Sequence, residues 1–99
     1  MEELICKAIN ERKVISFIYD GHRREVEPFT LGIHKDTSNV SLSAWWIGGF
    51  SKSNSTNPRW RLYSVESISG LEITSSIASN YQNGYNPDDK RMSSIICTV

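Results

Sequence analysis

The sequence lacks the features that mark several classes of protein. It has 99 residues, no net charge at neutral pH, only two cysteines and three prolines. It also has no apolar run long enough to cross a bilayer, so we expect no membrane partner. A chain of this length, with 38% hydrophobic and 22% charged residues, has the composition of one globular domain. We therefore expect a single soluble domain over residues 1–99.

A secretory signal is also lacking. Met1 leads into Glu2 and Glu3 rather than into a basic region and an apolar stretch, which predicts a cytoplasmic location. The two cysteines lie near opposite ends of the chain, and intracellular proteins more often hold such residues as small buried hydrophobes than as a disulfide. We therefore predict that Cys6 and Cys97 are both reduced.

Groupings typical of catalytic and metal sites are missing as well. The side chains of the types that bind zinc most often are far apart in the sequence, at Cys6, His22, His34 and Cys97. No two of them have the close spacing of a zinc knuckle. The acidic residues 88–89 fall in a polar segment, and Glu25 and Glu27 alternate along a predicted strand without a nearby base. These absences predict no metal, no cofactor and no enzymatic activity.

What the chain does have is an uneven distribution of charge. Residues 12–61 hold eight Lys or Arg and four Asp or Glu, a net charge of +4, whereas the two ends together carry −4. This asymmetry is weaker than that of a dedicated DNA-binding domain. It favours an anionic partner if the basic residues converge in space, which depends on the fold.

The first part of the chain has the pattern of a helix followed by a β-hairpin. Residues 2–12 have the spacing of a short amphipathic helix. Its apolar face comprises Leu4, Ile5, Ala8 and Ile9. Residues 14–19 are mostly β-branched or aromatic, as in a strand, and Asp20-Gly21 is a strong signal of a tight hairpin turn. A returning strand begins near Arg23, and Pro28 predicts an edge or a bulge that bends it.

Further strands are predicted from alternating apolar residues. They cover residues 40–47, 59–65 and 71–73, and the polar segment 51–58 has the composition of a hairpin loop. Residues 74–94 are rich in Ser, Asn and Gly and are expected to be mostly irregular. The apolar segment 95–99 is either a last strand that closes the sheet or an exposed end that awaits a partner chain.

Strict alternation also assigns faces to the strand residues. It places Val26 and Leu31 on opposite faces of the returning strand. It assigns Trp46 and Trp60 to the core and leaves Trp45 exposed. About five short strands after one helix predict a mainly β domain, a small and strongly bent barrel of about the size of SH3-like or OB folds.

Four successive segments resemble the WYL domain of bacterial regulators. They are AINERKVISFIYDG, RREVEPFTL, VSLSAWW and RWRLYSVESISGLEI, and the resemblance covers residues 5–73. The strongest matches are Phe17 and Tyr19 after the helix, the pattern of Arg24, Val26 and Pro28, and the triplet Trp60, Arg61 and Leu62. Each match is short, but together they follow the order and spacing of the family.

The resemblance implies a fold and a function. WYL domains are similar to Sm-like barrels of the SH3 class, and they bind nucleic acid or nucleotide-type ligands in the regulation of prokaryotic transcription or defence. They are sensors rather than catalysts. A helix-turn-helix segment usually precedes them, and here a single short helix does, so we expect a free-standing module. The sequence also departs from the family, because only Leu42 of its name-giving triplet agrees. Ser41 replaces the central tyrosine, and Ser64 replaces a second arginine.

The candidate binding residues are arginines and aromatic residues on neighbouring predicted strands. They are Arg24, Arg61, Arg59, Trp45 and Tyr19. Guanidinium groups bind phosphate with paired hydrogen bonds, and an aromatic face stacks on a base. The alternative is a solvated surface on which the arginines pair with glutamates, namely Glu25, Glu27 or Glu66. The resemblance gives Arg24 and Arg61 precedence.

Two functional hypotheses follow from these observations. The first is a regulatory module that binds single-stranded nucleic acid or a nucleotide ligand through the arginines. The second is a protein-interaction or homodimerisation module that has lost its ligand, in line with Ser41, Ser64 and the zero net charge. In that case the terminal segment 95–99 would pair with a second copy of the chain.

Overall fold

The computed structural model describes residues 1–49 and 59–99, so the loop predicted at residues 51–58 lies outside the described residues. The elements are α1 (Glu2–Glu11), β1 (Lys13–Tyr19), β2 (His22–His34), β3 (Val40–Gly49), β4 (Trp60–Ser64), β5 (Ser69–Ile77) and β6 (Met92–Thr98). A short 3-10 helix, η1 (Val65–Ser67), joins β4 to β5. The domain is therefore mainly β with one N-terminal helix, as predicted.

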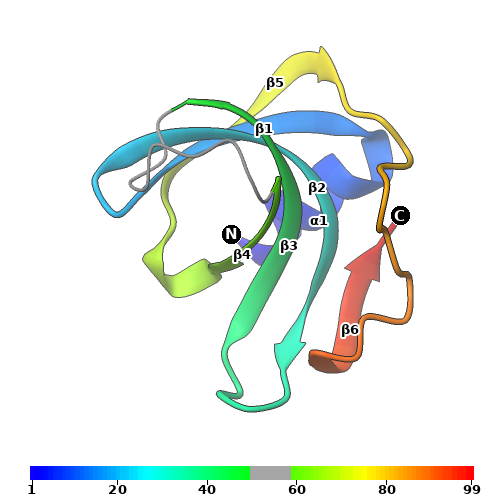
Figure 1. The fold of residues 1–99 in the computed structure, drawn as a ribbon. Helices are drawn as coiled ribbons and strands as arrows, with labels where there is room; N and C mark the ends of the chain where they lie inside the picture. Colours follow the sequence, from blue (N-terminus) through cyan, green and yellow to red (C-terminus); the bar gives the residue numbers. More distant parts are fainter. Residues whose placement is uncertain (50–58) are drawn as a thin grey trace.

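All the described strands belong to one antiparallel sheet (Figure 1). Its order is β4-β3-β2-β1-β5, and β6 pairs with β2 outside this path. The terminal segment thus forms a strand, but it does not close the sheet, which stays open with β4 and β5 at its two ends. Among the described residues, no helix is long and apolar enough to cross a membrane.

β2 bends near Pro28 and changes its partner there. Along one edge it pairs with β1 as far as Val26 and with β6 from Thr30 onward. Along the other edge it pairs with β3, with a shift of register between Pro28 and Thr30. The bulge predicted from Pro28 is therefore confirmed. It also reverses the alternation, so the assignment of Val26 and Leu31 to opposite faces is wrong, and both belong to one core.

Arg12 ties the end of α1 to this bend. It has a positive φ of 51°, and its backbone N–H donates to the carbonyl groups of Ala8 and Ile9. Its guanidinium donates to the carbonyl oxygen of Pro28 at 2.7 Å and also to that of Ser79. No residue of β1 or β6 is paired with Pro28, so the guanidinium supplies a donor where the ladder is interrupted.

The predicted hairpin between β1 and β2 turns at Asp20 and Gly21, whose φ angles are 52° and 76°. Two successive residues with positive φ are what a type I′ turn requires, and Asp-Gly adopts this conformation readily. The turn sets Phe17 opposite Arg24. Because cross-strand partners share a face of the sheet, Arg24 lies on the face of Phe17, which is part of the core.

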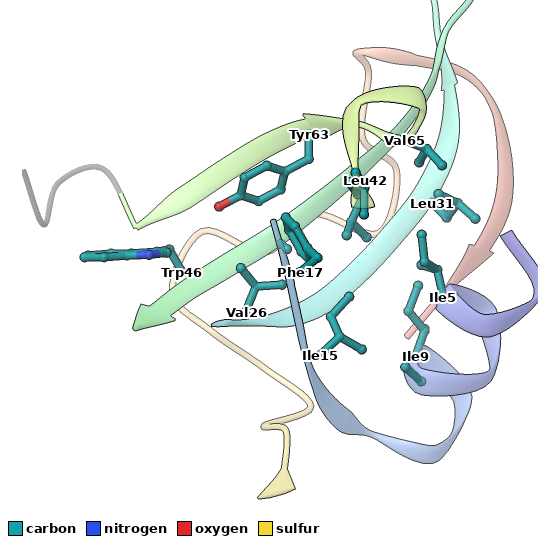
Figure 2. Close-up of a cluster of buried hydrophobic side chains, with 13 residues drawn as sticks. Ile5, Ile9, Ile15, Phe17, Val26, Leu31, Leu42, Trp46, Tyr63 and Val65 are labelled. Atoms are coloured by element: carbon teal, nitrogen blue, oxygen red, sulfur yellow. The ribbon is translucent and has the colours of Figure 1, made fainter. Parts of the chain in front are cut away.

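The core lies between α1 and the concave face of the sheet (Figure 2). Ile5, Ala8 and Ile9 supply the apolar face of α1 as predicted, but Leu4, which was assigned to the same face, is 47% exposed. On β4 the core residue is Tyr63, which pairs with Leu42 of β3. The assignment of Trp60 to the core face is wrong, because Trp60 lies an odd number of positions from Tyr63 and so reaches the other face.

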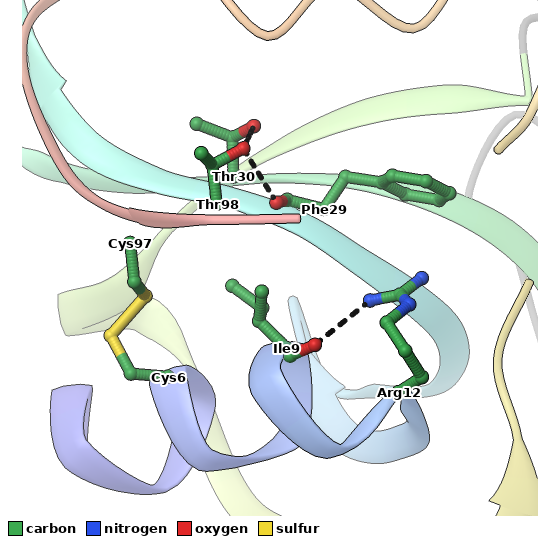
Figure 3. The surroundings of a disulfide bond; sticks show 7 residues. All are labelled: Cys6, Ile9, Arg12, Phe29, Thr30, Cys97 and Thr98. Carbon is green, nitrogen blue, oxygen red and sulfur yellow. Dashed lines mark hydrogen bonds between the residues drawn. A yellow bond between two sulfur atoms is a disulfide. The ribbon is translucent and has the colours of Figure 1, made fainter. Parts of the chain in front are cut away.

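A disulfide joins the two ends of the chain (Figure 3). It links Cys6 on α1 to Cys97 on β6, with Cα atoms 5.8 Å apart and a sequence separation of 91. The prediction that both cysteines are reduced is wrong. The reason is topological, because β6 pairs with the second half of β2 and runs beside α1, which brings residues from opposite ends of the sequence together.

The disulfide should contribute strongly to stability, because it closes a loop with a sequence separation of 91 in the unfolded chain. Reduction with dithiothreitol is expected to lower the free energy of unfolding by about 2–5 kcal/mol. Urea titrations with and without the reductant measure this loss. The control is the double variant Cys6→Ser/Cys97→Ser. Its free energy of unfolding should equal that of the reduced protein and should not change when the reductant is added. Equal stability of the oxidised and reduced protein would contradict the account.

Candidate functional site

Three arginines meet aromatic side chains at one end of the core. Arg24 lies on β2, Arg61 on β4, and Arg59 directly before β4. The guanidinium carbons of Arg59 and Arg61 each lie 5.2 Å from the centre of the Trp46 ring. That of Arg24 lies 5.7 Å from the centre of the Tyr19 ring. Both distances are within the range of cation–π attraction.

Tyr63 connects the two halves of this arrangement. Its ring centre lies 4.9 Å from that of Tyr19, and the charges of Arg24 and Arg61 both act on its hydroxyl. Figure 2 shows the Tyr63 hydroxyl and the Trp46 indole at the end of the core that is remote from α1. We call the whole set the basic aromatic site, which comprises Tyr19, Arg24, Trp46, Arg59, Arg61 and Tyr63.

The glutamates next to Arg24 in the sequence are engaged elsewhere. Glu25 forms a salt bridge with Arg23 at 3.1 Å, and Glu27 accepts hydrogen bonds from the segment that follows β5. Arg24 itself is 5% exposed and donates to the backbone carbonyl of Tyr19 at 3.3 Å. Within residues 1–49 and 59–99, neither of the two salt bridges includes Arg24. Among the described residues, no carboxylate therefore neutralises the buried charge of Arg24.

Three buried polar atoms of this site have no hydrogen-bond partner in the described part of the chain. They are Arg24 Nε, Trp46 Nε1 and the Tyr63 hydroxyl. An unpaired buried polar group costs about 1–3 kcal/mol, and folded proteins leave few of them. The guanidinium and indole nitrogens are donors only, and a hydroxyl can donate too, so acceptor atoms would satisfy all three. Acceptor oxygens would therefore complement these three atoms, which are buried in the described structure.

The electrostatics of the site are visible at Tyr63. Burial raises the pKa of its hydroxyl above the ordinary value of 10.0, and the charges of Arg24 and Arg61 oppose this shift. The Arg24 guanidinium lies close enough to favour the phenolate, although it does not form a well-aligned hydrogen bond with the hydroxyl. Desolvation outweighs the attraction of the two cations, so Tyr63 is a neutral hydroxyl at physiological pH.

The structure brings together four of the five residues that the sequence suggested. Arg24, Arg59, Arg61 and Tyr19 all belong to the basic aromatic site. Trp45 does not, because it points to the other face of the sheet, where its ring centre lies 5.4 Å from that of Trp60.

Sequence reasoning missed Trp46 and Tyr63 as members of the site. Trp46 was expected to be an ordinary core residue, and burial alone does not reveal that its indole N–H lacks a partner within residues 1–49 and 59–99. The signal for Tyr63 was present, since alternation along residues 59–63 puts it on the same side as the two arginines of that segment.

No metal or family assignment accompanies this site. Within the described ranges, no three His, Cys, Asp or Glu side chains gather as metal ligands would. Comparisons of the chain with models of protein families, with curated proteins and with solved structures found no match. The geometry of the basic aromatic site therefore carries the functional argument.

The variant Tyr63→Phe tests the unpaired hydroxyl. At neutral pH it should equal the wild type in stability or exceed it by about 1 kcal/mol, because no hydrogen bond is lost. The raised pKa of Tyr63 adds a pH dependence. In the wild type, the contribution of Tyr63 to the free energy of unfolding is complete below about pH 10 and is lost as the pH rises through the pKa of the folded state. The variant has no titrating hydroxyl at this position and so lacks this pH dependence.

Urea unfolding between neutral pH and about pH 11 measures both effects. The difference in stability should widen in favour of Tyr63→Phe above about pH 10. A loss of about 1 kcal/mol or more at neutral pH would show instead that the hydroxyl is hydrogen-bonded in the folded protein.

Proposed function

We propose that this chain is a non-catalytic regulatory or sensor module that binds nucleic acid or a nucleotide-type ligand at the basic aromatic site. The observation that carries the proposal is a group of three buried polar atoms, on Arg24, Trp46 and Tyr63, that have no partner among the described residues and lie next to the charges of Arg59 and Arg61. A phosphate group supplies negative charge next to the arginines and acceptor oxygens for these three atoms.

The aromatic residues add a reason to favour a nucleotide over a simple anion. Tyr19 is partly exposed beside the Arg24 guanidinium, and stacking of a base on an aromatic ring contributes about 1–3 kcal/mol. Single strands present unstacked bases together with phosphates at regular spacing. We therefore favour single-stranded nucleic acid, or one of its nucleotide units, as the ligand.

We further propose that the chain is a WYL-like module with an Sm-like, SH3-like barrel, and that it acts in prokaryotic transcription or defence. The order of one helix and then bent antiparallel strands supports it, and so does the meeting of Arg24 and Arg61 around Tyr63. Ser41 and Ser64, which replace the family's tyrosine and second arginine, are cross-strand partners on β3 and β4. They therefore alter one place in the sheet and leave both arginines in position.

The compartment belongs to the proposal as well. The sequence predicts the cytoplasm, whereas the disulfide between Cys6 and Cys97 favours an oxidising environment, because cytosolic reductants keep most thiols reduced. We keep the cytoplasm in the proposal, because regulation of transcription takes place there and the structure reports only that Cys6 and Cys97 are close enough to be joined.

A salt series with short single-stranded DNA and RNA tests the ligand class. The double variant Arg24→Gln/Arg61→Gln should bind more weakly, and the slope of log affinity against log salt should fall by roughly 1.4, about 0.7 for each lost phosphate contact. Circular dichroism verifies that the variant is folded, since Arg24 is buried.

Arg23→Gln is the matched control for this series. Arg23 neighbours Arg24 in β2, but its side chain is 62% exposed and pairs with Glu25. Its removal should leave the affinity nearly unchanged. The proposal fails if no oligonucleotide or nucleotide binds at low salt, or if Arg23→Gln weakens binding as much as the double variant.

The second candidate function is self-association through β6. In the described residues β6 pairs with β2 along one edge, and Ile95 and Ile96 are 40% and 41% exposed. An apolar strand with an available edge is able to pair with a second copy about a two-fold axis. Light scattering should then show a dimer that Ile96→Lys converts to a monomer without loss of stability. A monomeric mass at high protein concentration would exclude this function.

A further inference from the structure

A cavity lies on the face of the sheet opposite the core. It has a volume of about 310 Å³ and is bordered by β2, β3, the start of β4 and residues 84–91. Small-molecule sites in proteins begin at about 300 Å³, so it has room for one small ring-shaped ligand. None of its lining residues belongs to the basic aromatic site.

One wall of this cavity is aromatic. The rings of Trp60 and Tyr85 are inclined by only 23°, with centres 6.3 Å apart. Phe29, which is fully buried, supports both of them, at 5.0 Å from Trp60 and 5.1 Å from Tyr85. Trp60 and Tyr85 are partly exposed, so they offer ring surface to a ligand.

The rest of the lining is polar but carries no net charge. Arg91 and Asp89 form a salt bridge at 2.6 Å, and Arg91 also donates to the Ser43 hydroxyl at 3.1 Å. This pairing lowers the pKa of Asp89 and raises that of Arg91, so both stay ionised and neutralise each other. Asn86 uses its side-chain oxygen to accept from the Asp88 N–H at 3.0 Å. Its amide nitrogen can act as a donor toward a ligand, because the bond described for Asn86 uses only its oxygen.

The walls are held in place by bonds of their own. The Trp60 indole donates to the carbonyl of Asn83 at 2.7 Å, and the Tyr85 hydroxyl donates to the carbonyl of Val99 at 2.9 Å. Gly84 has a φ of +91°, and a Cβ atom there would lie 3.1 Å from the Trp60 indole nitrogen. Glycine thus lets the backbone approach the ring closely. A cavity with fixed walls loses little entropy when a ligand binds.

We propose that this cavity binds a neutral hydroxylated ring, namely one sugar unit of a mono- or oligosaccharide. A sugar ring has an apolar face of C–H groups that suits Trp60 and Tyr85. Its hydroxyl groups at the edge both donate and accept, which suits the carboxylate, guanidinium and amide groups of Asp89, Arg91 and Asn86. A phosphate suits the cavity less, because the cation is already paired. This inference stands independently of the nucleic-acid site.

The test is a titration of the full chain, followed by amide NMR, with glucose, mannose, N-acetylglucosamine and their disaccharides. At least one of these probes should shift the resonances of Gly84, Asn86 and Arg91. Its affinity should change little with salt concentration, because no net charge is neutralised. Uridine and uridine monophosphate serve as comparison probes for a nucleoside and an anion.

Asn86→Asp is the diagnostic variant. It keeps the oxygen that accepts from Asp88 but removes the amide donor, so affinity for the bound sugar should fall about three- to tenfold. Asn80→Asp is the matched control, because Asn80 is an exposed amide of the same irregular segment that does not line the cavity. It adds the same charge and should bind as the wild type does.

Three results would overturn the inference. The first is that none of the sugars shifts the cavity resonances, and the second is that uridine or its monophosphate binds there more tightly than every sugar. The third is an equal loss of affinity in Asn86→Asp and Asn80→Asp, which would reveal a general effect of charge. A shift of the Trp60 indole resonance at the same sugar concentrations as the shifts of the cavity amides would support the inference further.

Discussion

The bend of β2 at Pro28 is the constraint on which the rest of the structure depends. A proline has no amide hydrogen, and the ladder shifts its register between Pro28 and Thr30. One long strand is thereby able to pair with β1 in its first half and with β6 in its second half. The guanidinium of Arg12 binds the Pro28 carbonyl at this point and joins the end of α1 to the bend. The same geometry brings β6 beside α1 and permits the disulfide.

The two faces that this bent sheet presents differ in their chemistry. The concave face ends in a group of arginines, buried donors and aromatic rings, with no carboxylate paired to Arg24 among the described residues. The opposite face carries a cavity in which Arg91 and Asp89 neutralise each other beside Trp60 and Tyr85. The first arrangement favours an anion because it is positively charged and three of its buried polar atoms have no hydrogen-bond partner among the described residues. The second favours a neutral ligand because its charges are paired.

Local signals in the sequence predicted the local structure well. The spacing of apolar residues predicted α1, Asp20-Gly21 predicted the first turn, and Pro28 predicted the bulge. The disulfide and the partner of β6 were not predictable in this way, because they depend on which distant segments meet. The buried side of β4 was assigned wrongly, since alternation separates Trp60 from Tyr63 but does not say which of them faces the core.

The candidate site was predictable only in part, because local patterns identify its residues but not the contacts between them. The resemblance pointed to Arg24 and Arg61, and strand alternation placed Tyr63 on the side of Arg61. Whether Arg24 pairs with a neighbouring glutamate depends on the directions of the side chains, which the sequence does not give. In the structure Glu25 pairs with Arg23, and Glu27 accepts a hydrogen bond from Ser79. In the part of the chain that the structure describes, the polar atoms of Trp46 and Tyr63 have no hydrogen-bond partner, and no sequence pattern predicts this property of the packed core.

The central claim is that the unpaired polar groups of the basic aromatic site are satisfied by a phosphate-bearing ligand. NMR of the nitrogen-bound side-chain protons tests it directly during titration with a short single-stranded oligonucleotide. The Arg24 Nε and Trp46 Nε1 protons should shift, whereas the Trp60 Nε1 proton, already bound to the Asn83 carbonyl at 2.7 Å, should stay in place. Unchanged Arg24 and Trp46 resonances at saturation, or shifts confined to Trp60, would contradict the account.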